Sequence, residues 1–189
     1  ELPEGVTSFG AAVVGKSLYV YGGHRGGEHD YSNEEQSDQF RRLELTVGGK
    51  WEDLPTGPKL QGLALVAHGG KLYRIGGFTA KNGAEEEQDL HSSAEVGVFD
   101  PQSNKWSAAP AMPSARSSHD AVVLGDKIYV VGGWKLAGKD VEPKWHDSAL
   151  VLDLSAKSPS WKELPQPPFQ RRALSLAAAV DLVCSHTCP

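Results

Sequence analysis

Short runs of apolar and β-branched residues, each bounded by Gly, Pro, Asn or Asp, recur along the chain and predict β-strands rather than helices. They divide the chain into three successive units of four strands. The first unit has predicted strands at Phe9–Val14, Leu18–Tyr21, Phe40–Leu45 and Lys50–Leu54. The second has them at Leu63–His68, Lys71–Ile75, Val96–Asp100 and Lys105–Ala108. The third has them at Ala121–Leu124, Lys127–Val131, Ala149–Leu154 and Ser160–Leu164.

Two further marks repeat with the same period as the strands. Glycine pairs begin at Gly22, Gly76 and Gly132, which are 54 and 56 residues apart. An aromatic residue precedes each pair by three or four positions, and a tryptophan follows each pair at intervals of 55 residues. The aromatic residues are Tyr19, Tyr73 and Tyr129, and the tryptophans are Trp51, Trp106 and Trp161. Self-similarity of this kind predicts a repeat architecture.

Composition supports an all-β, water-soluble chain. The 21 Gly and 12 Pro among 189 residues predict many turns and disfavour helices. The formal net charge of −5 offers no general attraction to nucleic acid or to an anionic membrane. The longest apolar run, at residues 177–180, is far shorter than the roughly 20 residues of a membrane span. We therefore expect neither a nucleic-acid nor a membrane partner, and the cellular location is left open.

The glycine pair after a hydrophobic strand, the preceding tyrosine and the later tryptophan resemble kelch repeats, over about residues 3–168. The resemblance implies an all-β fold of β-propeller blades, each with four antiparallel strands. In that reading residues 1–57, 58–112 and 113–168 are blades 1, 2 and 3. Residues 169–180 match the first strand of a fourth blade, and residues 181–189 form an atypical tail with the only cysteines, Cys184 and Cys188. A disulfide and a metal site are both poorly supported there, because the spacing fits no established motif.

Three blades do not close a ring, since propellers have about four to eight. One hypothesis is that two chains close a six-bladed ring as a homodimer through their open blade faces. The extra strand at 169–180 would then compete with the partner's first strand for the innermost position. The alternative is that the sequence is part of a longer propeller.

Candidate functional residues lie in the connections, because propeller sheets position loops that bind. Counting from Pro58, Pro113 and Pro168 places polar residues at equivalent points in the connections between blades. By the resemblance, arginines there grip acidic peptides, and an equally credible role is hydrogen bonding to carbonyls of the neighbouring blade. The expected ligand-binding residues are Gln61, Arg116, His119, Arg171, Arg172, Trp134, His24, Arg25, Trp145 and His146.

No catalytic motif or metal-ligand spacing is present, so no catalytic residue, metal or cofactor is predicted. The long connections after the glycine pairs are rich in Glu and Asp, which indicates a solvated acidic surface. The preferred interpretation is a non-catalytic binding or scaffolding module whose partner is a protein or acidic peptide, with self-association. The alternative is a propeller that binds an acidic sugar or isomerises a sugar, similar to sialic acid mutarotases, using Arg116 and His119.

Overall fold

A computed structural model describes residues 2–165 and 167–178, and every regular element in them is a β-strand. The first sheet contains β1 (Gly10–Val14), β2 (Ser17–Tyr21), β3 (Phe40–Glu44) and β4 (Trp51–Asp53). The second contains β5 (Ala64–His68), β6 (Lys71–Ile75), β9 (Val96–Asp100) and β10 (Lys105–Ala109). The third contains β11 (Asp120–Leu124), β12 (Lys127–Val131), β15 (Ala149–Asp153) and β16 (Trp161–Leu164). The predicted all-β fold of four-stranded antiparallel sheets is confirmed, and every strand boundary lies within one residue of its prediction.

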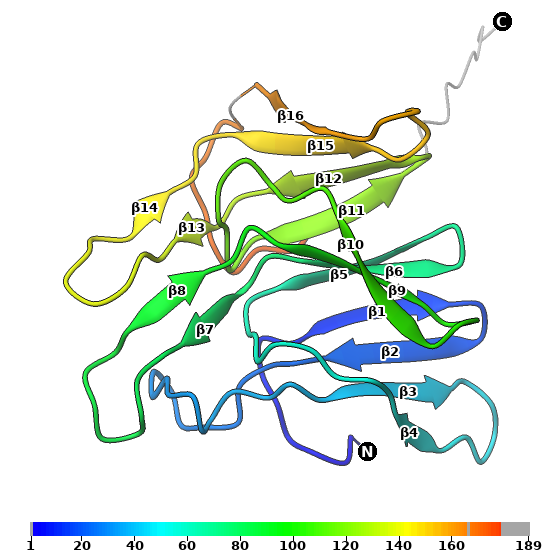
Figure 1. The fold of residues 1–189 in the computed structure, drawn as a ribbon, viewed down its shortest axis with the longest axis horizontal. Helices are drawn as coiled ribbons and strands as arrows, with labels where there is room; N and C mark the ends of the chain where they lie inside the picture. The colour runs from blue at the N-terminus through cyan, green and yellow to red at the C-terminus, as the bar shows by residue number, and fades with distance from the viewer. Residues whose placement is uncertain (1, 166, 179–189) are drawn as a thin grey trace, which may run out of the picture.

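The three sheets lie side by side as successive blades of an open arc (Figure 1). The innermost strands β1 and β11 each lie beside β5. A chain of backbone hydrogen bonds links the segments that lead into these strands. The Gly62 N–H donates to Ser8 O at 2.8 Å, the Ser118 N–H to Gly62 O at 2.7 Å, and the Ala173 N–H to Ser118 O at 2.9 Å. Each blade therefore holds the lead-in of the next one in the same way.

Each pair of neighbouring blades encloses an apolar core. Between blades 1 and 2 it includes Tyr21, Phe40 and Phe99, and between blades 2 and 3 it includes Ile75 and Ile128. These side chains meet because period-2 alternation gives each blade one face toward the preceding blade and one toward the following blade.

The tryptophan of each following blade closes the outer end of a core. The Trp106 indole N–H donates to Pro55 O, and the Trp161 indole N–H donates to Pro110 O, both at 2.8 Å. The equal spacing of these two contacts shows that the sequence period corresponds to one blade.

Close approach of neighbouring blades explains the glycine pairs. Gly76 has φ of +56°, and a Cβ at that position would lie 2.4 Å from Arg116 O of the next connection. A side chain there would be both strained and in collision with backbone. The glycine pair lets the next blade dock against the end of the strand.

Residues 169–178 differ from the prediction, because they contain no strand. The segment still docks on blade 3, where Gly133 N–H donates to Arg171 O at 2.7 Å and Leu176 N–H donates to Asp120 Oδ2 at 2.6 Å. A first strand needs a hairpin partner, and no tyrosine and glycine pair follow this segment in the sequence. Residues 179 and 180, and the tail with both cysteines, lie outside the described residues.

Two of the long connections contain small hairpins that the sequence analysis did not predict. They are β7 (Phe78–Ala80) with β8 (Leu90–Ser92), and β13 (Trp134–Lys135) with β14 (Lys144–Trp145). Both project from the same end of the sheets (Figure 1). Within the described residues, no helix is long and apolar enough to cross a membrane.

Candidate functional site

The connections between blades and the connections after the glycine pairs meet at one end of the sheets. Isolated bridges pair Thr7 with His24, Gln61 with Phe78, and Ser117 with Trp134. Each bridge joins a lead-in segment to the residue that follows a glycine pair. The sequence positions predicted to carry function are therefore brought to one end of the molecule, but their side chains are not equally accessible.

Arg116 is almost completely buried, at 1% exposure. Its Nη1 donates to Gly132 O at 2.7 Å and to Ser148 O at 3.0 Å. Burial lowers the pKa of the guanidinium to about 10, against the opposing effects of Glu163 and Asp147, so it remains charged at neutral pH. Of the two roles considered from the sequence, the geometry favours hydrogen bonding to backbone carbonyls over ligand capture.

His119 and His146 lie near Arg116 and are neutral at neutral pH. Burial, and after it the charges of Arg116 and His146, together lower the pKa of His119 to about 3. Burial, followed by Arg116, also lowers the pKa of His146. The His146 Nε2–H donates to Ala115 O at 2.9 Å. Both imidazoles therefore belong to the packing around Arg116.

Gln61 is 1% exposed, and neither amide atom of its side chain has a hydrogen-bond partner among the described residues. The sequence analysis aligned Gln61 with Arg116 and Arg171 by counting from the prolines, and the structure shows that this alignment is shifted by one residue. The carbonyls that accept from the second glycine of each pair belong to Leu60, Arg116 and Arg171. Gln61 therefore corresponds to Ser117, because the connection after Pro58 is one residue shorter than the one after Pro113.

His24 and Arg25 hold the first long connection in place. The buried His24 Nε2–H donates to Asp30 O at 2.8 Å, and its ring lies 5.0 Å from the Tyr31 ring between centroids. Arg25 Nη1 lies 3.2 Å from Glu4 Oε1. The structure places both residues away from Trp145 and its neighbours, in contacts local to blade 1.

The remaining predicted residues form an accessible group around β13 and β14. The Trp134 and Trp145 rings lie opposite each other across the hairpin, with centroids 5.7 Å apart, and Trp145 is 41% exposed. The Arg172 Cζ lies 4.2 Å from the Trp134 ring centroid, a cation–π geometry. Arg171 is exposed; its Nη1 donates to Gln170 O at 3.2 Å, and its backbone carbonyl accepts from the Gly133 N–H.

Two lysines that the sequence analysis missed lie on the opposite face of the same hairpin, because successive residues of a strand point to opposite faces. Lys135 and Lys144 lie directly opposite each other on β13 and β14, and both are exposed. Like charges at facing positions repel each other, which is unfavourable for the isolated hairpin. The signal available in the sequence was a Trp-Lys pair and a Lys-Trp pair flanking one turn. We call Trp134, Trp145 and Arg172 the tryptophan patch.

The acidic connection of blade 2 forms an ion pair with the connection of blade 3 and another within itself. Lys139 Nζ lies 2.6 Å from Glu87 Oε2, which raises the lysine pKa. The Asp89 carboxylate accepts from the Lys139 backbone N–H at 3.0 Å and lies 2.7 Å from His91 Nε2, and these contacts lower its pKa. Across the part of the chain that the structure describes, no three His, Cys, Asp or Glu side chains group in a way that would hold a metal ion.

Similar proteins are consistent with this architecture. Kelch repeat and BTB domain-containing protein 12 of Danio rerio is 27% identical over 189 residues, covering 95% of this chain and 29% of the relative. Kelch-like protein terF of Aspergillus terreus is 27% identical over 167 residues, covering 85% of this chain and 34% of the relative. The chain thus spans about a third of the length of these curated relatives.

A solved structure and a protein family also match. The structure of YjhT aligns with a TM-score of 0.67 at 20% identity, covering 89% of this chain and 54% of that one, which shows a shared fold. The family described as the KLHDC2/KLHL20/DRC7 Kelch-repeats domain matches residues 1–184. Since this match covers all three blades, the chain belongs to the kelch-repeat family.

Proposed function

We propose that the chain is a protein-binding module whose tryptophan patch holds an acidic segment of a partner protein. The observation that carries this proposal is the exposed Trp145 ring beside Trp134, over whose ring the Arg172 guanidinium lies. Kelch-repeat relatives that also carry a BTB domain are consistent with an interaction role for the repeats. The proposal concerns binding alone, because no described cluster of side chains suggests a reaction.

The chemistry of the patch selects the kind of partner. Guanidinium groups bind carboxylates, and a partly exposed tryptophan is the residue type most often found at binding hot spots. The positive charge is local, since the whole chain carries −5. An acidic peptide with an apolar or aromatic residue between its carboxylates would satisfy both the Arg172 guanidinium and the ring of Trp145.

Peptide binding to single variants tests the proposal. The probes are fluorescein-labelled octapeptides with one central Phe flanked by Glu, and matched peptides with Gln or Lys in place of Glu. We expect W145A and R172A each to weaken binding of the Glu peptide about tenfold or more. Fluorescence polarisation at two salt concentrations measures the affinities, and the Glu peptide should bind less tightly at high salt.

V141A is the matched control, because Val141 is exposed at the tip of the same hairpin but lies outside the tryptophan patch. It should bind as the unmodified chain does. Equal affinity for the Glu and Lys peptides, or unchanged binding in both W145A and R172A, would rule the patch out as an acidic-peptide site. The sugar-isomerising alternative relied on Arg116 and His119, and their burial gives it no support.

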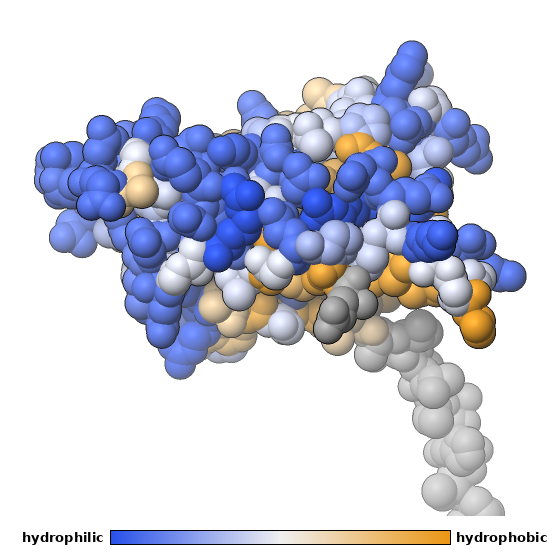
Figure 2. Space-filling view, turned by 90° about the horizontal axis from the view of Figure 1, so that it is seen from below, coloured by the Kyte–Doolittle hydropathy of each residue, from blue (hydrophilic) through white to orange (hydrophobic). Residues whose placement is uncertain are grey.

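We further propose self-association through the open blade faces. The face of blade 3 that has no neighbouring blade contains a hollow of about 210 Å³, in which Tyr129, Val151 and Leu164 lie among polar residues. The polar residues are Lys127, Asp153, Ser160 and Lys162. At the other end of the arc, the exposed Val13 lies on the outward face of blade 1. The blade 1 side of the molecule is mainly hydrophilic, with apolar residues gathered along one margin (Figure 2).

A further inference from the structure

Blade 2 differs from the other blades along one row of facing residues. In every blade this row crosses all four strands on the face toward the preceding blade. In blade 1 it is Ala11, Val20, Arg41 and Asp53, and in blade 3 it is Ala121, Val130, Leu150 and Glu163. In blade 2 it is Leu65, Arg74, Gly97 and Ala108. An arginine replaces a valine, and the two outer positions become small.

Arg74 is a charged group held inside the interface between blades 1 and 2. It is 7% exposed, and its Nη1 donates to the Tyr21 hydroxyl at 2.8 Å. Its Cζ lies 4.9 Å from the ring centroids of both Tyr21 and Trp106. Among the described residues, no carboxylate lies within ion-pair distance of it. A buried charge without a counter-ion is costly and is uncommon in folded proteins.

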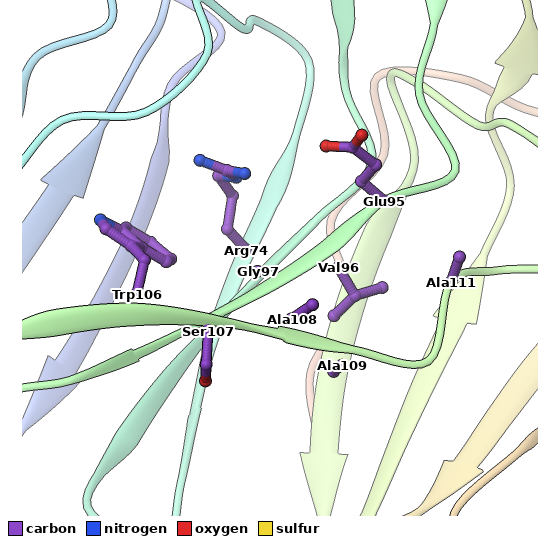
Figure 3. A pocket seen from close by; sticks show the side chains of 9 residues that line it. All are labelled: Arg74, Glu95, Val96, Gly97, Trp106, Ser107, Ala108, Ala109 and Ala111. Carbon is purple, nitrogen blue, oxygen red and sulfur yellow. The ribbon is translucent and has the colours of Figure 1, made fainter.

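The small residues leave room in front of this guanidinium. A pocket of about 510 Å³ extends along β9 and β10, and on the side of Arg74 it is lined by Glu95, Gly97, Trp106 and Ala108 (Figure 3). Its other lining residues are Val96, Ser107, Ala109 and Ala111. A Cβ on Gly97 would lie 3.2 Å from Arg74 Nη2, so this nitrogen stands directly over the floor of the pocket. Figure 3 shows Arg74, Trp106 and Glu95 on one side of the β9–β10 pair, with Ser107 and Ala109 directed to the other.

The pocket has the features of a small-molecule site. Its volume lies within the range of about 300–1,000 Å³ that is usual for such sites. Its wall is the Trp106 ring, its floor is backbone and Ala108, and its convergent polar group is the Arg74 guanidinium. The exposed Glu95 at the margin repels anions and so opposes their binding. Removing the charge of Glu95 therefore provides a control for the role of electrostatics in binding.

We propose that this pocket binds a small organic carboxylate with a flat apolar body. The carboxylate would accept hydrogen bonds from Arg74 and neutralise its charge. The apolar body would lie against Trp106 and Ala108, where it loses contact with water. This site lies in the interface between blades 1 and 2 and is independent of the tryptophan patch.

Ligand titration of the full chain tests the proposal. The probes are benzoate, phenylacetate and hexanoate, with benzamide as the uncharged match of benzoate, and the signal is the NMR shift of the Trp106 indole N–H and the Gly97 amide. We expect the carboxylates to shift both signals and benzamide to bind about tenfold or more weakly. The proposal fails if benzamide binds as well as benzoate. It fails equally if no carboxylate produces a shift at about 10 mM, beyond which binding would be too weak to be specific.

Variants taken from the other blades separate binding from folding. R74V installs the valine of blades 1 and 3, and we expect it to weaken benzoate binding about tenfold or more. A108E installs the Glu163 equivalent, which places an internal carboxylate near Arg74 and should weaken binding similarly while keeping the arginine. If R74V fails to fold, A108E decides.

Two further variants test the role of charge. E95Q should tighten benzoate binding about two- to fivefold, because it removes the repelling carboxylate. K105Q removes a positive charge from β10, the strand of Trp106 and Ala108, at a position outside the pocket. It should change benzoate affinity by less than about twofold at 0.15 M salt. Binding that is unchanged in A108E, or lost equally in K105Q, would contradict a site centred on Arg74.

Discussion

His119 occupies a position at which the neighbouring repeats carry apolar residues. Since Ser8, Gly62 and Ser118 are linked by equivalent hydrogen bonds, the residues that follow them, Phe9, Leu63 and His119, correspond. The pKa of His119 is lowered to about 3 in the folded chain, whereas an unfolded histidine titrates near 6.5. Below about pH 6.5 the unfolded state therefore binds a proton that the folded state does not, and stability falls as the pH is lowered.

We expect H119L to remove this pH dependence. In the unmodified chain the residue should lower the free energy of unfolding by about 1 kcal/mol per pH unit between about pH 6 and pH 4. Leucine is the residue of blade 2 at this position and cannot take up a proton. Urea unfolding at several pH values measures the slope, and H29L, which alters an exposed histidine, is the control. Equal slopes in the unmodified chain and in H119L would show that His119 is accessible to protons in the folded state.

The three arginines show what could be predicted from sequence at this scale. Arg116, Arg172 and Arg74 carry the same group, but the first binds buried carbonyls, the second stacks on the half-buried Trp134, and the third faces a pocket. The positions of Arg116 and Arg172 next to a blade connection were visible in the sequence. Their different exposure depends on side-chain direction, which one chain does not reveal. Arg74 was missed because it lies inside a predicted strand, where a single polar residue does not alter the hydrophobic pattern that predicts the strand.

At the scale of the element, the last strand of each blade docks through its tryptophan. Trp161 on β16 donates its indole N–H to Pro110 O and packs against the core between blades 2 and 3. W161F keeps an aromatic ring but leaves this carbonyl without its donor. We expect it to lower the free energy of unfolding by about 1–2 kcal/mol.

Denaturant unfolding of W161F and W145F compares a partly buried, hydrogen-bonded indole with an exposed one. W145F should change stability by less than about 0.5 kcal/mol, because Trp145 contributes to the surface of its hairpin. A W161F chain as stable as W145F would show that the repeated tryptophan contact contributes nothing to the docking of blades.

The main strands were predictable and the small hairpins were not, for a physical reason. Four or five residues of alternating pattern, as in Lys127–Val131, bury one face against a neighbouring blade and so leave a readable signal. The β13–β14 hairpin has two residues in each strand and is held by contacts with neighbouring connections, including Ser92 N–H to Leu136 O at 2.9 Å. Such contacts between distant segments leave no local pattern. The tryptophan patch could be anticipated only from its individual residues.

At the scale of the whole molecule, the open arc has two different ends. The outward face of blade 1 is crossed by ion pairs, such as Arg41 Nε to Asp53 Oδ1 at 2.9 Å, with the apolar Val13 nearer the inner edge. The outward face of blade 3 instead has a hollow in which Tyr129, Val151 and Leu164 lie among charged residues. Two chains related by a two-fold axis through the centre of the ring would bring these unlike faces together at two joints. The result would be a ring of six blades.

Light scattering after size exclusion tests whether the arc closes in this way. We expect the unmodified chain to be a dimer at micromolar concentration and V13E to be a monomer, because the substitution puts a charge into the joint. V47E, which alters a fully exposed turn residue, is the matched control and should remain a dimer. Residues 171–173 already make the hydrogen bonds through which a following blade docks on blade 3, so the partner's first strand must displace them. A chain shortened to residues 1–168 should therefore dimerise more tightly, and a monomer in both the full and the shortened chain would refute closure by a second copy.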